Sequence, residues 1–338
     1  MVGIDMDLSF DAVYYEPDSL RYELGKTLKQ KYQDLPWIEI ESHNRIPEFS
    51  SAENREFPKL KRHLIIGIRK THKYVGNHKV SDWLVPYTSS GCRAMCLYCY
   101  LVCNYNKCSY LRLFVNREQM MLKLLKAGRE AAEPQTFEIG SNSDLVLENT
   151  ITGNLNWTID YFARNGRGFL TFPTKFDMVE PLLGLDHRGK TIFRMSFNPA
   201  EIIRRVEIGT SPLETRVKAL NDMAEAGYPV GMLIAPVILV KDWKRMYGEL
   251  IRYLADVLSQ KVKKTGFIEI ILMTYSFVHN AINTEAFPGA MKIYDHCLMT
   301  GRGRGKYSYR PEVREEAEDF LRNELKHKLG SMKILYIS

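Results

Sequence analysis

From about residue 84 onward, short apolar runs alternate with segments whose apolar residues recur at helical spacing. The runs are typical of buried strands, and the spacing indicates amphipathic helices. Such alternation predicts βα units built around a parallel sheet. We expect strands at 84–88, 136–140, 169–174, 191–198, 228–238 and 267–273, and helices at 116–132, 152–165, 178–183, 211–227 and 242–258.

The helix expected at 211–227 carries the clearest boundary signals. Ser211 is a favourable N-cap residue, Pro212 suits the first turn, and Glu214 completes a capping box with Ser211. Gly227 is placed to end the helix.

The predicted order of elements indicates an α/β protein with an incomplete barrel. Six strands are fewer than the eight that close a TIM barrel, so an open, partial (β/α)6 TIM-type barrel is the simplest architecture. A doubly wound open sheet is the alternative. We divide the chain into an N-terminal extension at 1–83, a barrel at 84–275 and a C-terminal region at 276–338, and we expect both ends to pack on the barrel. The ends carry an expected strand at 64–68, a helix at about 312–327 and a last strand at 333–337.

Composition and charge narrow the class of protein. The 338 residues carry a formal net charge of +7, which permits a polyanionic partner without requiring one. The N-terminus has neither the basic nor the apolar stretch of a signal peptide. The longest apolar run, 231–240, is too short to span a bilayer. We therefore expect a cytoplasmic protein with no membrane partner, in which clustered cysteines bind metal or react rather than pair as disulfides.

Three cysteines stand together directly after the first expected strand, in the segment SSGCRAMCLYCYL. Cys92, Cys96 and Cys99 can bind three irons of a [4Fe–4S] cluster and leave the fourth open to a small ligand. A zinc site is the alternative, with Cys103 and Cys108 as the second pair of ligands, but no histidine accompanies them in the loop. Active sites of (β/α) barrels lie at the C-terminal ends of the barrel strands, which is where this cysteine segment stands.

The spacing CxxxCxxC, with the aromatic residue Tyr98 before the third cysteine, resembles the signature of the radical S-adenosylmethionine (SAM) superfamily. More narrowly, the chain resembles the spore photoproduct lyase family over most of its length. The matching blocks are SHN at 42–44, IGIRKT at 66–71, CLYCYL at 96–101, SD at 143–144, TKF at 174–176, HRGKTIFRMSFN at 187–198, GTSPLETR at 209–216, AGYPVGMLIAPV at 226–237 and GKYSY at 305–309.

This resemblance implies an enzyme that splits the methylene-bridged thymine dimer in DNA through a 5′-deoxyadenosyl radical. Its cofactors would be a [4Fe–4S] cluster and SAM. Lys175 and Ser196 would hold SAM, with Ser143 and Asp144 nearby. These residues follow or end expected strands and so can face one barrel mouth. Without the resemblance, Lys175 reads equally well as a solvated lysine and Asp144 as a helix cap.

The resemblance also assigns a radical path. Tyr98 and Tyr100 match two tyrosines that relay a hydrogen atom in the family, and Tyr98 is placed to lie over the nucleoside. Ser141 occupies the position of a cysteine that returns a hydrogen atom to the product radical. Because a serine O–H bond is much stronger than a thiol S–H bond, another donor is needed, and Cys103 and Cys108 are candidates. Buried structural cysteines are the alternative for both.

Two further segments depart from the family pattern. The run IEIILMTYSF at 268–277 replaces a more polar stretch and predicts a more apolar pocket wall. The hairpin segment GRGRGKY lacks the expected Arg-Tyr pair. We expect it to bind DNA phosphates, with an aromatic residue lost or moved to Tyr307; the basic stretch at 59–73 is a second phosphate-binding candidate. The expected DNA-binding residues of the hairpin are Arg302, Arg304, Lys306 and Tyr307.

The sequence therefore predicts a radical SAM lyase that repairs DNA carrying a thymine photolesion. Its expected partners are that DNA and a reductant such as flavodoxin or ferredoxin, and it is expected to act as a monomer. The changes at Ser141 and at 268–277 keep open a related radical SAM enzyme with another nucleic-acid or small-molecule substrate. A non-catalytic iron–sulfur or zinc DNA-binding module is the more distant alternative.

Overall fold

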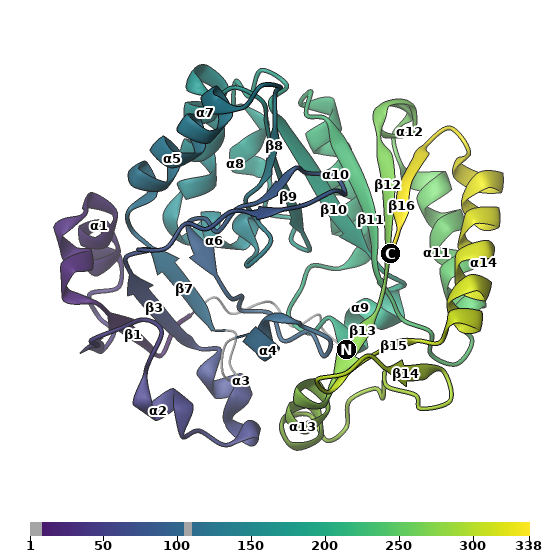
Figure 1. The fold of residues 1–338 in the computed structure, drawn as a ribbon, viewed down its shortest axis with the longest axis horizontal. Coiled ribbons are helices and arrows are strands. Elements are labelled where there is room, and N and C mark those ends of the chain that lie inside the picture. Colours follow the sequence, from purple (N-terminus) through teal and green to yellow (C-terminus); the bar gives the residue numbers. More distant parts are fainter. Residues whose placement is uncertain (1–8, 105–109) are drawn as a thin grey trace.

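A curled sheet of eight strands forms the centre of the molecule (Figure 1). The computed structural model describes residues 9–104 and 110–338. Every neighbouring pair of strands in this sheet is parallel except β4 and β5. The strands, in spatial order, are β16 (Lys333–Ile337), β12 (Phe267–Leu272), β11 (Val230–Val237), β10 (Thr191–Phe197), β9 (Phe169–Thr174), β8 (Thr136–Glu138), β5 (Trp83–Leu84) and β4 (Val75–Gly76).

The strand order confirms the partial barrel. From β5 to β12 each strand lies beside the next strand of the same sheet along the chain, so the sheet has no point at which the order reverses. Such a reversal defines a doubly wound sheet, and that alternative was wrong. The sheet gains β4 and the C-terminal strand β16 at its two edges.

Helices follow the strands and pack on the outside of the curled sheet (Figure 1). Their apolar faces are buried, as the helical spacing in the sequence indicates. No helix in the described part of the chain is apolar and long enough to cross a bilayer. The helices that accompany this sheet are α5 (Arg117–Glu130), α6 (Leu145–Thr152), α7 (Asn154–Asn165), α9 (Ala200–Val206), α10 (Leu213–Glu225), α11 (Trp243–Val257) and α14 (Pro311–Leu329), with the short α8 (Glu180–Leu183) and α12 (Gln260–Thr265) between them.

Two local predictions were wrong for identifiable reasons. Ser211 does not cap α10: its hydroxyl donates to Asp177 Oδ1 at 2.7 Å, so it is used to hold the loop after β9. The strand expected at 84–88 is also divided. β5 ends at Leu84, and the chain then crosses to another sheet, where Ser89–Ser90 form β6.

That second sheet has five strands and its own apolar core. Its first three strands come from the N-terminal extension, but β6 and β7 flank the cysteine loop. Ser90 pairs with Arg112 across β6 and β7, so both ends of this loop are fixed to the same sheet. The strands are, in spatial order, β2 (Trp37–Glu39), β1 (Ala12–Tyr15), β3 (His63–Gly67), β7 (Leu111–Phe114) and β6 (Ser89–Ser90).

A third, smaller sheet lies at the bottom of the view in Figure 1. β13 (Thr274–Ser276) continues from the barrel strand β12, and β14 (Met299–Gly301) forms an antiparallel hairpin with β15 (Lys306–Tyr309). The helix α13 (Phe277–Ala286) starts directly after β13. The Gly-rich basic segment is thus the tip of a hairpin attached to the barrel.

Candidate active site

The three cysteines of the signature line one cavity of about 490 Å³. This volume is within the range of small-molecule sites. Cys92, Cys96 and Cys99 are half-buried, and their loop is tied to the segment after α9 because Met95 N–H donates to the Ile208 carbonyl at 2.8 Å. The backbone N–H of Ala94 donates to Cys92 Sγ at 3.4 Å.

The cysteine geometry fits a cluster of several metals better than one zinc ion. Tetrahedral zinc needs its sulfur ligands within about 4 Å of one another. Cys92, Cys96 and Cys99 are not among the described residue sets whose ligand atoms all lie within 4.8 Å of one another. Burial raises the pKa of the Cys92 thiol to about 12, so a bound cation is needed to hold it as a thiolate. Three cysteine sulfurs around one cavity suit an iron–sulfur cube.

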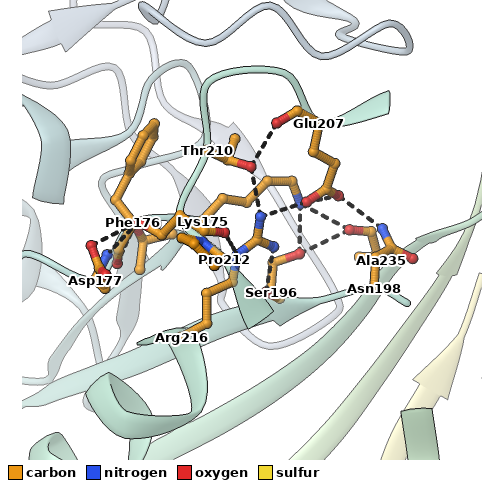
Figure 2. Close-up of polar contacts among 12 residues, drawn as sticks. Lys175, Phe176, Asp177, Ser196, Asn198, Glu207, Thr210, Pro212, Arg216 and Ala235 are labelled. Atoms are coloured by element: carbon orange, nitrogen blue, oxygen red, sulfur yellow. Dashed lines mark hydrogen bonds and ion pairs between the residues drawn. The ribbon is translucent and has the colours of Figure 1, made fainter. Parts of the chain in front are cut away.

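Lys175 and Ser196, predicted on adjacent strands, meet on the wall of the same cavity (Figure 2). Lys175 follows the last residue of β9, and Ser196 lies near the end of β10. Lys175 Nζ donates to Ser196 Oγ at 2.5 Å and to the Ala235 carbonyl at 2.9 Å, and Ser196 Oγ donates to the same carbonyl at 2.8 Å. The arrangement presents one cation, one hydroxyl and one carbonyl to a small zwitterionic ligand.

A buried carboxylate that the sequence analysis missed organises this wall. Glu207 is 1% exposed and lies between two cations: its Oε1 is 3.6 Å from Lys175 Nζ, and its Oε2 accepts from Arg216 Nη2 at 2.7 Å. Tyr98 OH and Asn198 Nδ2 also donate to Oε1, at 2.5 and 2.8 Å. Burial alone would raise the pKa of Glu207, but the two cations and these hydrogen bonds lower it to about 2. Glu207 is therefore a fixed negative charge.

Arg216, in the matched block GTSPLETR, completes this polar cluster. Its side chain is fully buried, and its guanidinium also donates to the backbone carbonyls of Ser211 and Ser196 at 2.8 and 2.9 Å (Figure 2). It therefore fixes the end of β10, where Ser196 lies, against the start of α10. Because Glu207 neutralises it, the buried guanidinium keeps both charge balance and hydrogen bonds.

Asp144 and Ser143 are both on the cavity wall, but their side chains already have partners. Asp144 caps α6 by accepting from the backbone of Val146 and Leu147 at 3.1 and 3.2 Å, and it also accepts from the Lys175 N–H at 3.0 Å. Ser143 Oγ accepts from Ser89 Oγ at 2.7 Å. The carboxylate of Asp144 thus fixes the backbone next to Lys175, and direct contact of either side chain with SAM stays a prediction.

Tyr98, Tyr100 and Ser141 also line the cavity. Tyr98 is held by Glu207, whereas Tyr100 is 52% exposed and its hydroxyl donates to the Ser141 carbonyl. The three residues are therefore brought together next to the cysteines, and their roles in a radical path stay predictions. Cys108 and the side chain of Cys103 lie outside the described residues; the backbone of Cys103 is in α4 (Leu101–Asn104).

The floor of the cavity is a second ionic cluster that the sequence analysis missed. Arg194 lies two residues before Ser196 on β10, so both side chains face the inside of the barrel. Its guanidinium donates to Glu138 Oε2 at 2.6 Å and lies 3.1 Å from Glu269 Oε2, and Tyr336 OH donates to Glu269 Oε1 at 2.6 Å. Four strands, β8, β10, β12 and β16, are thereby joined across the barrel interior.

The wall contributed by 268–277 is largely apolar, as predicted. Ile271, Leu272 and Met273 line the cavity at the end of β12, and Thr274 follows them. The charged exception in this segment is Glu269, which belongs to the floor.

The hairpin carries the four expected DNA-binding residues at its tip and on β15. Arg302, Arg304 and Lys306 are exposed, and none of them has a carboxylate within 4.0 Å in the part of the chain that the structure describes. Tyr307 is half-buried and packs against Phe277 and Tyr294. In contrast, Lys61 of the basic stretch is 2% exposed, and its ammonium donates to the Cys92 carbonyl at 2.6 Å. The prediction that Lys61 contacts phosphates was therefore wrong.

Comparisons with known proteins agree on one family. The sequence model described as spore photoproduct lyase matches residues 8–338. The chain is 33% identical over 322 residues to a spore photoproduct lyase of Bacillus subtilis (strain 168), covering 91% of this chain and 94% of that one. It is 30% identical over 335 residues to one of Geobacillus sp. (strain Y412MC61), covering 96% and 98%.

Solved structures give the same result. A spore photoproduct lyase complexed with dinucleoside spore photoproduct superposes with a TM-score of 0.90 at 29% identity, covering 98% of this chain and 99% of that one. A variant spore photoproduct lyase with bound AdoMet (SAM) and dinucleoside spore photoproduct also gives 0.90, at 30% identity, covering 97% and 99%.

Proposed function

Because this chain belongs to the spore photoproduct lyase family, we propose that it is a radical SAM lyase that returns the methylene-bridged thymine dimer in DNA to two thymines. One observation carries the proposal: a cavity of about 490 Å³ is lined at once by the three signature cysteines and by the Lys175–Ser196 pair. A cluster-binding module without catalysis has no need of that pair.

The residues of the cavity suit the two cofactors of such an enzyme. Cys92, Cys96 and Cys99 would hold three irons of a [4Fe–4S] cluster, which leaves the fourth iron for SAM. The ammonium of Lys175 would bind the SAM carboxylate, and the Ala235 carbonyl is an acceptor for its amine. Glu207 holds the ammonium of Lys175 in place through the contact at 3.6 Å. When bound, the reduced cluster and SAM would supply a 5′-deoxyadenosyl radical, which would take a hydrogen atom from C6 of the bridged dimer.

The exposed basic hairpin supports DNA as the substrate. Arg302, Arg304 and Lys306 would neutralise phosphates beside the cavity, and this attraction would offset the few kcal/mol needed to move the lesion out of the base stack. We expect a reductant such as flavodoxin or ferredoxin to supply the electron, and we expect the protein to act as a monomer in the cytoplasm.

A related radical SAM enzyme with another substrate is the second candidate, and Ser141 is the observation that favours it. Ser141 lines the cavity, yet its hydroxyl is a poor donor of a hydrogen atom to a carbon radical. Under the lyase proposal another group must therefore return the hydrogen atom. Cys103 and Cys108 are the predicted donors, because both lie within a few residues of the cluster loop.

The test is an anaerobic turnover assay with the reconstituted and reduced protein. Formation of 5′-deoxyadenosine and recovery of thymidine after nuclease digestion of the DNA are followed by chromatography, with and without DNA that carries the methylene-bridged dimer. Lesion-dependent recovery of thymidine is the expected result. Formation of 5′-deoxyadenosine without repair would favour the second candidate, and no 5′-deoxyadenosine from a loaded, reduced cluster would contradict both.

A further inference from the structure

Phe277 has the largest exposed fraction, 63%, of the large hydrophobic side chains in the described part of the chain. Its neighbour Val278 is 36% exposed. Phe277 is the first residue of α13, and the hydroxyl of Ser276 caps that helix by accepting from the His279 N–H. The helix start is therefore fixed by polar contacts, and the exposed ring is not needed to form it. A single exposed apolar side chain needs no explanation by itself, so the surroundings of Phe277 decide whether it belongs to a contact surface.

The backbone of Phe277 is connected both to a residue that lines the cavity and to the tip of the basic hairpin. Thr274, three residues earlier, lines the cavity. The Phe277 N–H donates to the Gly305 carbonyl at 3.1 Å, which joins the start of α13 to the hairpin tip. Gly305 has a φ of +68°, and a Cβ there would lie 3.1 Å from Phe277 Cδ2. Glycine thus permits both the turn and the close approach of the ring.

Three aromatic side chains, packed one on the next, support the Phe277 ring. Tyr307 meets it edge-on at a centroid distance of 5.2 Å, Tyr294 packs on Tyr307 at 5.0 Å, and Tyr275 stacks on Tyr294 at 5.7 Å. Tyr307 is thus part of the support, and Phe277 is the ring that remains accessible. A ring held in place by packing loses little conformational entropy when a ligand stacks on it.

Charge around the ring selects the ligand. Arg302, Arg304 and Lys306 are exposed on the adjoining hairpin, and no described carboxylate lies within 4.0 Å of them. An accessible aromatic ring flanked by cations matches the two parts of a nucleic-acid strand, because bases stack on the ring while phosphates meet the cations.

We propose that Phe277 is the residue on which a DNA base next to the lesion stacks when the lesion enters the cavity. This inference rests on the proposed function and adds to it the residue that supports the DNA left outside the cavity. The same helix is fixed to the cluster loop, because His279 Nε2 lies 2.9 Å from the Cys99 carbonyl and Asn283 Nδ2 donates to the Leu97 carbonyl at 2.8 Å. The stacked base would therefore set the position of the lesion relative to the cluster.

The test compares two substrates in the cluster-loaded protein: a lesion-bearing duplex and the dinucleoside lesion, which has no neighbouring base. Phe277→Ala is expected to lower kcat/KM for the duplex about 5- to 100-fold more than for the dinucleoside, the range of one base–aromatic stack. Phe277→Trp should restore most of the loss. Phe169→Ala, which removes a partly exposed ring at the start of β9, is the matched control and should change neither substrate.

Equal losses on both substrates, or an unchanged duplex rate in Phe277→Ala, would overturn the inference while leaving the lyase proposal intact. If the unmutated protein turns over neither substrate, the proposed function fails instead. The stacking inference is then decided by duplex affinity, measured by fluorescence anisotropy. Phe277→Ala should weaken binding of the lesion duplex by a similar factor, and an unchanged affinity would reject the inference.

Discussion

Replacing Glu207 by glutamine tests the charge balance of the cavity wall. Glutamine keeps the size of the side chain and resembles the protonated acid, so it removes the negative charge and one of the two hydrogen-bond acceptors. The positive charges of Lys175 and Arg216 are then no longer neutralised by a carboxylate. The side chains of Glu207 and Arg216 are 0% exposed, so water cannot take its place. Removing one partner of such a buried pair costs about 3–5 kcal/mol.

The pKa of Glu207 gives a second route to this magnitude. Folding lowers it from 4.5 to about 2, and each unit is worth about 1.4 kcal/mol, so the ionised form contributes about 3 kcal/mol at pH 7. Because the pKa is depressed in the folded state, this contribution is complete above pH 4.5 and is lost as the pH falls through 2. At pH 3 about 1 kcal/mol should remain.

Urea unfolding of the metal-free protein, followed by circular dichroism, measures the effect. Glu207→Gln should lower the free energy of unfolding by about 3 kcal/mol at pH 7 with an unchanged m-value. The difference in this free energy between the variant and the unmutated protein should be smaller at pH 3. The control is Glu201→Gln, which removes an exposed pair with Arg205 and should cost less than about 0.5 kcal/mol. A loss of unfolding free energy below about 1 kcal/mol at pH 7 would refute the reasoning. So would a difference between variant and unmutated protein that does not change with pH.

Three further changes address the cofactors and the chemistry. Lys175→Met should weaken SAM binding about 10- to 100-fold in equilibrium dialysis, because a charged hydrogen bond is lost; an unchanged affinity would remove Lys175 from the SAM site. Lys61→Met should lower the cluster midpoint potential by about 60 mV in an EPR-monitored titration, a tenfold change in the redox equilibrium, because a buried cation favours the more negative reduced cluster. The control Lys59→Met, which replaces an exposed lysine, should leave the midpoint potential unchanged. Equal potentials in the two variants would contradict an effect of Lys61 on the cluster. Ser141→Cys should raise the yield of intact thymine and lower by-products in product chromatography because a thiol can return the hydrogen atom, whereas Ser143→Cys should not; no gain in Ser141→Cys would point to a different donor or substrate.

The barrel was predictable because its signals are local. β9 has the bounds that its apolar run indicates, and β10 ends one residue earlier than expected. The proximity of Lys175 and Ser196 follows from that placement, since the carboxyl ends of adjacent parallel strands meet at one edge of the sheet. The cysteine spacing likewise lies within one loop.

The polar clusters could not be predicted because they join residues far apart in sequence. Glu207 ends α9 with no motif of its own, and only the fold brings it to Lys175 and Arg216. Most of the N-terminal sheet was missed for a related reason. In β7 the buried Arg112 interrupts the apolar pattern, and the neighbouring strand β3 is more than forty residues away along the chain.

The pairing of β6 with β7 has a consequence for how the metal is acquired. Ser90 and Arg112 lie opposite each other, so the loop that carries the cysteines is already closed by the sheet. For a loop of about 20 residues, closure costs on the order of 3 kcal/mol of chain entropy, and here the hydrogen-bonded strands offset it before any iron binds. The metal-free chain should therefore keep its fold, and the proposed cluster, once lost to oxygen, would be rebuilt on a ready scaffold without a cycle of unfolding and refolding.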